Sequence, residues 1–317
     1  MTPNLKHVVL LVVGLMMTIP AAWAKEGGDQ YGFGSENVMT GNMPPPGSYL
    51  LDYASYYHGE LRNGSGKKVV LPNGSVPNAT AEADAPRFVQ VTPFKLLGGT
   101  YLVHVILPLV NLNLSVPDSN GSLMHHQKFS VGDMGFSPFA LAWHKNNGIH
   151  FLAAVDFYLP TGFYSKGDPA SIGANYNSFE PLFCLTYLPK TMWESSVKLM
   201  YNTKTRNGAT NYHSGDEFHM DYFAGKHLGG WTVGGSGYFL KQVTDDTIAD
   251  AIVPASAMNS AGKRGQVFAV GPSISYTTNH HATLIAYWQH ETLVRNRFSG
   301  DKVWFKLVYP LVGARHL

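Results

Sequence analysis

The stretch SGDEFHMDYFAGKHLGGWTVGGSGYFLKQV, residues 214–243, contains two long runs joined by a Gly-Gly pair at 229–230. Polar and apolar residues alternate along the first run, in the order Glu217, Phe218, His219, Met220, Asp221 and Tyr222. Successive side chains of a strand point to opposite faces of a sheet, so this run predicts one polar and one apolar face. Glycine adopts the positive φ of tight hairpin turns. We therefore predict a hairpin of two strands, 214–228 and 231–243.

The same arrangement recurs along the rest of the chain. Runs rich in Val, Leu, Tyr, Phe and Thr, without helical periodicity, are typical of strands. Together with the hairpin they predict twelve strands, at 48–61, 87–97, 100–114, 131–144, 149–160, 176–188, 192–203, 214–228, 231–243, 264–278, 281–296 and 301–311.

The separators between these runs alternate between short and long. The short ones are 98–99, 145–148, 189–191, 229–230 and 279–280. The long, polar ones are 62–86, 115–130, 161–175, 204–213 and 244–263, and the last separator on their side, 297–300, is short. An outer-membrane β-barrel has short periplasmic turns, longer extracellular loops and an even number of strands. The alternation therefore predicts a barrel with both chain termini in the periplasm.

Strand length distinguishes this barrel from a soluble sheet, which would also alternate. A membrane-spanning strand needs about 9–11 residues, whereas globular strands are usually about 5–6 residues long. Aromatic residues near the predicted strand ends are typical of interfacial girdles: Tyr49, Tyr57, Tyr101, Trp143, Tyr187, Trp193, Trp231, Trp288 and Tyr309. We predict an all-β fold, a transmembrane antiparallel up-and-down β-barrel of about 12 strands in residues 48–317.

The first 24 residues have the organisation of a secretory signal peptide. A short basic start precedes an apolar run from Val8 to Ile19, and small residues follow up to Ala24. A transmembrane helix needs about 20 apolar residues, more than this run provides. We predict cleavage near Ala24 and export to the bacterial outer membrane. Residues 25–47 are polar and rich in Gly and Pro, so they form either a flexible periplasmic lead or a plug within the barrel.

Composition supports this class of protein. Charged residues make up 14% of the chain and aromatic residues 13%, and there are 33 glycines, which favours an all-β chain. The net charge of +2 gives no reason to expect a nucleic-acid partner. Cys184 is the only cysteine, so the chain forms no internal disulfide. An exported protein of this size without disulfides is typical of the bacterial envelope.

Strand parity assigns a set of polar residues to the inside of the barrel. A barrel of twelve strands is wider than one of eight, which side chains fill, and narrower than a porin. Its lumen can therefore be plugged or can pass small solutes, and its charges either brace the wall or contact a solute. Arg295 and Arg297 are predicted at the mouth. The predicted lumen-lining residues are Asp52, His104, Asp156, Glu180, Glu194, Lys198, Glu217, His219, Asp221, Glu291, Arg295 and Lys306.

Two kinds of metal site are alternatives for the acidic clusters. Ligands two residues apart on one strand are roughly 6.5–7 Å apart, so Glu217, His219 and Asp221 converge poorly on one ion. The loop acids that could serve as hard oxygen ligands for calcium are Asp245, Asp246 and Asp250. Solvated loop acids and a polar inner wall explain both clusters more simply, so we predict no metal and no cofactor.

A hydrolase is the third chemical alternative. Ser214 has His213 and Asp216 as neighbours in the sequence, and His219 follows on the next strand. A nucleophile needs a base within hydrogen-bond reach, and this spacing secures none. The sequence contains neither a GxSxG nor an HExxH motif. We therefore predict no catalytic residue.

Several phrases, in the same order along most of the chain, resemble the meta-pathway phenol-degradation protein family. They include MPPPGSYLLDYASYY at 43–57, VGDMGFSPFALAWH at 131–144, IGANYNSFEPLFCLTYL at 172–188 and FAVGPSISY at 268–276. The resemblance implies an outer-membrane β-barrel that helps hydrophobic or aromatic compounds cross, with no enzyme activity. One departure concerns the end of the chain, because many such barrels end in an aromatic residue and this sequence ends in Leu317.

These observations predict a monomeric channel for passive uptake of small hydrophobic or aromatic compounds. No ATP site or energy-coupling signal is present in the sequence. The expected partners are the solute, outer-membrane lipid and lipopolysaccharide. Two alternatives stay open: a structural or adhesive barrel without cargo, and a lipid-active barrel enzyme.

Overall fold

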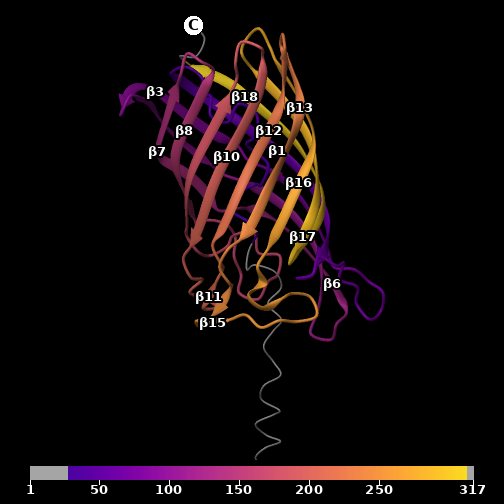
Figure 1. Cartoon of the computed structure of the whole chain (residues 1–317). Coiled ribbons are helices and arrows are strands. Elements are labelled where there is room, and N and C mark those ends of the chain that lie inside the picture. The colour runs from indigo at the N-terminus through magenta and orange to yellow at the C-terminus, as the bar shows by residue number, and fades with distance from the viewer. Residues whose placement is uncertain (1–27, 313–317) are drawn as a thin grey trace, which may run out of the picture.

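The computed structural model describes residues 28–312, so the predicted signal peptide and Leu317 lie outside the described residues. Twelve long strands form one antiparallel sheet that closes on itself, and Figure 1 shows them as a tilted barrel. In order around the wall they are β1 (Gly47–Arg62), β3 (Arg87–Leu96), β4 (Gly99–Ile106), β7 (Met134–His144), β8 (Ile149–Leu159), β9 (Ser178–Tyr187), β10 (Trp193–Lys204), β12 (Glu217–Leu228), β13 (Trp231–Gln242), β16 (Gln266–Thr277), β17 (Thr283–Arg295) and β18 (Arg297–Val312).

The predicted barrel of about twelve strands is confirmed. β18 closes it by pairing with β1 from Ser48–Val312 to Arg62–Arg297. The hairpin that the opening stretch predicts is β12 and β13, joined at Gly229 with a φ of 64°. The predicted separator at 297–300 is wrong: Asn296, with a φ of 51°, makes the turn and β18 begins directly after it. These residues continue the ladder because β1 is long enough to pair with them.

Three further strands extend the sheet at the long-loop end, beside the barrel at the lower right of Figure 1. They are β2 (Asn78–Asp84), β5 (Leu109–Pro117) and β6 (Leu123–Val131). β1 pairs with β3 through residues 47–51 and with β2 through residues 54–60. Parts of the predicted loops 62–86 and 115–130 are therefore strand, and the predicted strand 100–114 is two strands. Pro86 and Pro108 lie at the breaks, because proline has no N–H to continue a ladder.

The remaining long loops carry little regular structure of their own. A small sheet of β11 (Tyr212–His213), β14 (Thr247–Ile248) and β15 (Ala251–Ile252) connects two of them, and η1 (Ala261–Lys263) is a single 3₁₀ turn. Within residues 28–312, no helix is long and apolar enough to cross a membrane.

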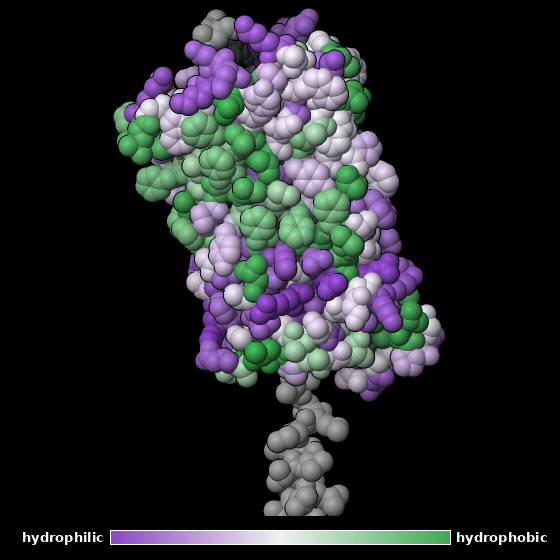
Figure 2. All heavy atoms as spheres, viewed as in Figure 1, coloured by the Kyte–Doolittle hydropathy of each residue, from purple (hydrophilic) through white to green (hydrophobic). Residues whose placement is uncertain are grey.

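The outer face of the barrel carries an apolar belt. On the face shown in Figure 2, hydrophobic side chains lie across the middle of the barrel, with hydrophilic residues toward both ends. Phe139, Phe305 and Leu284 are 66%, 62% and 56% exposed. Side chains of this kind rarely cover a large surface in contact with water, whereas the lipid-facing band of an outer-membrane barrel consists of them.

Aromatic residues predicted for the girdles divide between the two faces. Trp193 and Trp231 are exposed at the short-turn end, and Trp231 packs on Tyr276 with ring centroids 4.7 Å apart. The prediction is wrong for Tyr49 and Tyr57. Both point inward, where Tyr49 donates to the Pro45 carbonyl at 2.7 Å and Tyr57 donates to Glu291 at 2.9 Å. The odd-numbered residues of β1 share the inner face, since strand side chains alternate.

Residues 28–46, here called the threaded segment, run inside the barrel from the long-loop end to the short-turn end. At the long-loop end Asp29 forms an ion pair with Arg297. The described residues therefore begin at the long-loop end, and the prediction that both ends of the chain lie on the short-turn side is wrong for residue 28. At the short-turn end the Gly41 N–H donates to Thr186 Oγ1 at 3.0 Å. Phe33 and Asn37 between them are 4% and 1% exposed. The segment therefore fills much of the space that the wall encloses.

An arginine on the belt distinguishes a membrane barrel from a soluble one. We expect Phe305→Arg, in the middle of β18, to lower the free energy of unfolding in phospholipid vesicles by about 2–4 kcal/mol, because lipid solvates a guanidinium poorly. Urea titration followed by heat-modifiable gel migration measures this change. Val70→Arg, at an exposed loop position, is the matched control and should change little. Equal effects of the two substitutions would contradict a lipid-facing belt.

Candidate functional site

Asp221 on β12 is the first inner-wall acid that holds the threaded segment. Its Oδ2 accepts a hydrogen bond from the Tyr31 hydroxyl at 2.5 Å and one from the Glu36 N–H at 3.1 Å. Its Oδ1 accepts from the Gly34 N–H at 2.9 Å. Asp221 is fully buried. A buried carboxylate needs such donors, because burial removes its hydration. The irregular backbone of the segment supplies N–H donors, whereas the backbone N–H groups of the wall strands are used in the sheet.

Glu36 makes the converse contact, from the segment to the wall. Its carboxylate forms ion pairs with Arg87 at 2.6 Å and with Lys306 at 2.8 Å, and it accepts a hydrogen bond from Tyr53. Arg87 lies on β3, Tyr53 on β1 and Lys306 on β18. One side chain of the threaded segment thus connects three strands on both sides of the barrel closure.

Glu194 on β10 anchors the segment nearer the short-turn end. Its Oε1 accepts from the Met39 N–H at 2.6 Å and from Ser196 at 2.5 Å. Its Oε2 lies 2.7 Å from His227 Nε2. The anchors are therefore distributed along the length of the lumen.

The other inward-facing candidates contact neighbouring strands or the rings of the segment. His104 Nε2 lies 3.1 Å from Asp156 Oδ1, Glu180 accepts from Asn202 at 2.9 Å, and Glu217 pairs with Lys204 at 2.9 Å. Glu291 accepts from Tyr57 and from the Gly300 N–H, each at 2.9 Å. His219 packs edge-on against Phe33 with ring centroids 5.0 Å apart. Lys198 Nζ lies 4.4 Å from the centre of the Tyr31 ring.

The structure contradicts the lumen prediction for two residues. Tyr53 points inward to Glu36, so its neighbour Asp52 points to the outer face and is half-buried there. Arg295 is exposed because β17 contains a bulge, with Leu293 at a φ of 53°. The register passes from Gln266–Arg295 to Phe268–Thr292, which leaves one extra residue on β17 and reverses the parity after it.

Sequence reasoning missed several residues that form the site. Arg87, Tyr53 and Glu36 were not predicted to face the lumen, although Glu36 and Arg87 form its most connected ion pair. Arg87 directly follows Pro86, and no other charged residue occurs in β3 before Lys95. A charge in that position is the signal that could have placed it inside. Arg297 was predicted at the mouth, and it lies 5.3 Å from the centre of the Phe33 ring.

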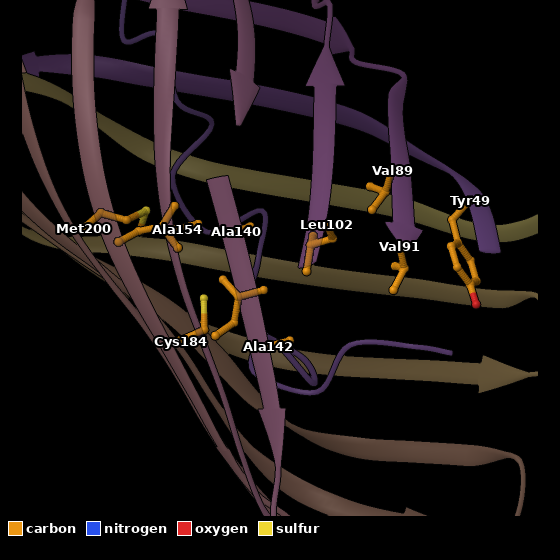
Figure 3. Close-up of a cluster of buried hydrophobic side chains, with 11 residues drawn as sticks. Tyr49, Val89, Val91, Leu102, Ala140, Ala142, Ala154, Cys184 and Met200 are labelled. Atoms are coloured by element: carbon orange, nitrogen blue, oxygen red, sulfur yellow. The ribbon is translucent and has the colours of Figure 1, made fainter. Parts of the chain in front are cut away.

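Two cavities remain between the threaded segment and the wall. The smaller one, about 80 Å³, lies among apolar side chains that Figure 3 shows on several strands, including Leu102, Ala140 and Ala154. The larger one, about 160 Å³, extends toward the breaks in the sheet, where Ala85 and Pro108 line it. Five residues line both cavities and are here called the junction cluster: Glu36, Arg87, His104, Asp156 and Lys198.

The side chains considered for a metal or calcium site do not meet at one point. In residues 28–312, no group of three or more His, Cys, Asp or Glu side chains could hold an ion. Asp245 accepts hydrogen bonds from Arg264, which lower the pKa of that carboxyl, and Asp250 pairs with Arg206 to the same effect on its pKa. Asp246 accepts from the Gly215 N–H at 2.7 Å. The three loop acids thus have separate partners.

The hydrolase residues also lie apart. His213 Nε2 is 2.9 Å from the Lys204 carbonyl, and Asp216 accepts from Tyr201 at 3.1 Å. His219 packs against Phe33. Within the described residues, the buried Ser214 hydroxyl has no hydrogen-bond partner. The two histidines and the acid of the hydrolase alternative therefore contact separate partners.

This geometry defines the class, a twelve-stranded outer-membrane β-barrel with a segment threaded through it. The fold is similar to the crystal structure of the COG4313 outer membrane channel from Pseudomonas putida F1, with a TM-score of 0.70 and 13% identity over 85% of this chain and 97% of that chain. The translocator domain of the autotransporter NalP from Neisseria meningitidis is less similar, with a TM-score of 0.48 and 8% identity over 86% of this chain and 91% of that chain.

The family model described as "Putative MetA-pathway of phenol degradation" matches residues 59–307. The chain therefore belongs to this family, which confirms the resemblance seen in the sequence. None of the curated proteins matches the sequence.

Removing the carboxylate of Glu36 should destabilise the barrel. Glu36→Ala leaves Arg87 and Lys306 buried without their partner, and breaking a buried pair typically costs about 3–5 kcal/mol. We expect a lower transition temperature in heat-modifiable gel migration. Glu82→Ala is the control, because Glu82 on β2 bonds Asn111 at an exposed site. A Glu36 variant as stable as the Glu82 variant would refute the bracing role.

Proposed function

We propose that the protein is an outer-membrane channel through which small hydrophobic or aromatic molecules diffuse passively. The observation that carries this proposal is the pair of cavities inside the barrel, which share the junction cluster. Apolar side chains form most of the smaller cavity, and apolar and polar side chains together line the larger one. Ligand sites in proteins are typically concave and apolar with a few convergent polar groups. A route through both cavities would lead a solute along the threaded segment, from the long loops toward the short turns.

In this proposal the threaded segment is a plug. Its hydrogen bonds to Asp221 and Glu194 and the ion pairs of Glu36 close the lumen at rest. The cavities measure about 80 and 160 Å³, so each holds no more than a small molecule. A solute can then cross the whole lumen only when part of the segment moves. The apolar belt supports a location in the outer membrane, with the long loops facing lipopolysaccharide. The barrel closes on itself, so a monomer suffices.

Uptake into vesicles tests the channel. We expect protein reconstituted in vesicles with a lipopolysaccharide outer leaflet to raise the initial rate of labelled toluene entry above that of protein-free vesicles. Heat-modifiable migration of the same sample verifies that the barrel is folded. A rate equal to the protein-free control would reject the channel and favour a structural or adhesive barrel without cargo.

Loosening the plug should raise the rate further. Tyr31→Phe removes the donor to Asp221, and a hydrogen bond to a charged group contributes about 1.5–3 kcal/mol. Because 1.4 kcal/mol is a factor of about ten in a population, we expect toluene entry at least about tenfold faster if opening limits the rate. Asn111→Ala, on the extra strand β5, is the control and should leave the rate unchanged. A slower or unchanged rate in the Tyr31 variant would show that the segment does not gate the lumen.

A further inference from the structure

Lys198 differs from the other buried lysines of the lumen. It is 4% exposed on the inner face of β10. Lys204 and Lys306 form ion pairs with Glu217 and Glu36 at 2.9 and 2.8 Å. Within residues 28–312, the Lys198 ammonium has no carboxylate within 4.0 Å and no hydrogen-bond acceptor, and its contact is with the Tyr31 ring. Buried charges are normally paired, because burial without a partner is costly.

Arg87, which also lines both cavities, has donors left over as well. Only its Nη1 is bonded, to Glu36 at 2.6 Å and to Tyr53 at 3.2 Å. Within the described residues its Nε is fully enclosed without a partner, and its Nη2 also forms no hydrogen bond. A guanidinium carries five N–H donors. Arg87 on β3 and Lys198 on β10 therefore present unfilled donors to the same space.

The carboxylates around this space are already engaged. Glu36 bonds Arg87 and Lys306, and Asp156 bonds His104. Two further acids line the larger cavity. Asp29 pairs with Arg297, and Asp133 accepts from Gln30 and from the N–H groups of residues 162 and 174. None of these acids lies within hydrogen-bond distance of Lys198. The ammonium of Lys198 is therefore available to an acceptor from a ligand.

The larger cavity has the size for one aromatic ring, and one part of its wall is apolar. It measures about 160 Å³, and Ala85, Ile106, Pro108 and Trp304 are among the residues that line it. An apolar protein cavity of about 150 Å³ binds benzene. The charged end of such a ligand would meet Lys198 and Arg87, because both lie where this cavity meets the smaller one.

We propose that the junction cluster binds a small aromatic carboxylate, of the size of benzoate. Its carboxylate accepts hydrogen bonds from Lys198 Nζ and Arg87 Nη2, and its ring occupies the larger cavity. Charge-assisted hydrogen bonds of this kind are roughly twice as strong as neutral ones, so the site prefers the anion to a neutral phenol of the same size. The inference rests on the proposed passage of small aromatic molecules and names one substrate class for that route.

Calorimetry on the full, detergent-solubilised barrel tests this site at pH 7 with benzoate, phenol and acetate. We expect the wild-type protein to bind benzoate at least tenfold more tightly than phenol or acetate. Lys198→Met keeps the length of the side chain and removes the charge, so it should weaken benzoate binding at least tenfold and leave phenol binding within twofold. Lys302→Met is the matched control, since Lys302 also lies inside the barrel, bonds the Phe33 carbonyl at 3.3 Å and lines neither cavity.

Each outcome decides the proposal. Equal binding of benzoate and phenol by the wild-type protein overturns it without any variant. Benzoate binding that survives in a folded Lys198→Met barrel, or that falls equally in Lys302→Met, also overturns it. Lys198→Arg should restore benzoate binding and thereby separates loss of charge from loss of fold. Toluene entry into vesicles is independent of these results, so failure of the anion site and failure of the channel are distinguishable.

Discussion

A strand in lipid has no water to bond its N–H and C=O groups, and this constraint closes the barrel. β18 satisfies it by pairing with β1 along the full length of both strands. Closure tilts the strands and encloses a space whose width depends on their number. With twelve strands this space is wider than side chains of the wall fill, and a second element occupies much of it. Residues 28–46 are that element.

The threaded segment and the wall depend on each other electrostatically. The wall presents buried acids such as Asp221 and Glu194, and the segment supplies backbone N–H donors that a paired strand cannot offer. The segment presents Glu36, and the wall supplies Arg87 and Lys306. Neither partner is solvated once the barrel forms, so each contact replaces hydration that burial has removed. The same arrangement leaves Lys198 without a carboxylate at the junction of the two cavities.

Most of the barrel was predictable because its signals are local. Alternation along β12 and the glycines after Leu228 predict a hairpin without any knowledge of the other strands. The errors arise where the backbone departs from regular pairing. Pro108 divides one predicted strand into β4 and β5, and the bulge at Leu293 reverses the direction of Arg295. The alternation of residues along one strand cannot show where an extra residue is inserted. The bulge is seen only in the register of β17 against β16.

The sequence by itself determined the all-β class, the number of barrel strands, the alternation of loops and turns, and the inward direction of residues such as His219 and Asp221. Each of these depends on neighbouring residues in the chain. Only the tertiary structure decided that Glu36 lies between Arg87 and Lys306, that Asp52 faces outward, and that Lys198 meets two cavities without an ion pair. Those facts depend on which strands meet across the lumen, and the distances across a closed barrel are set by its tilt and width rather than by local sequence.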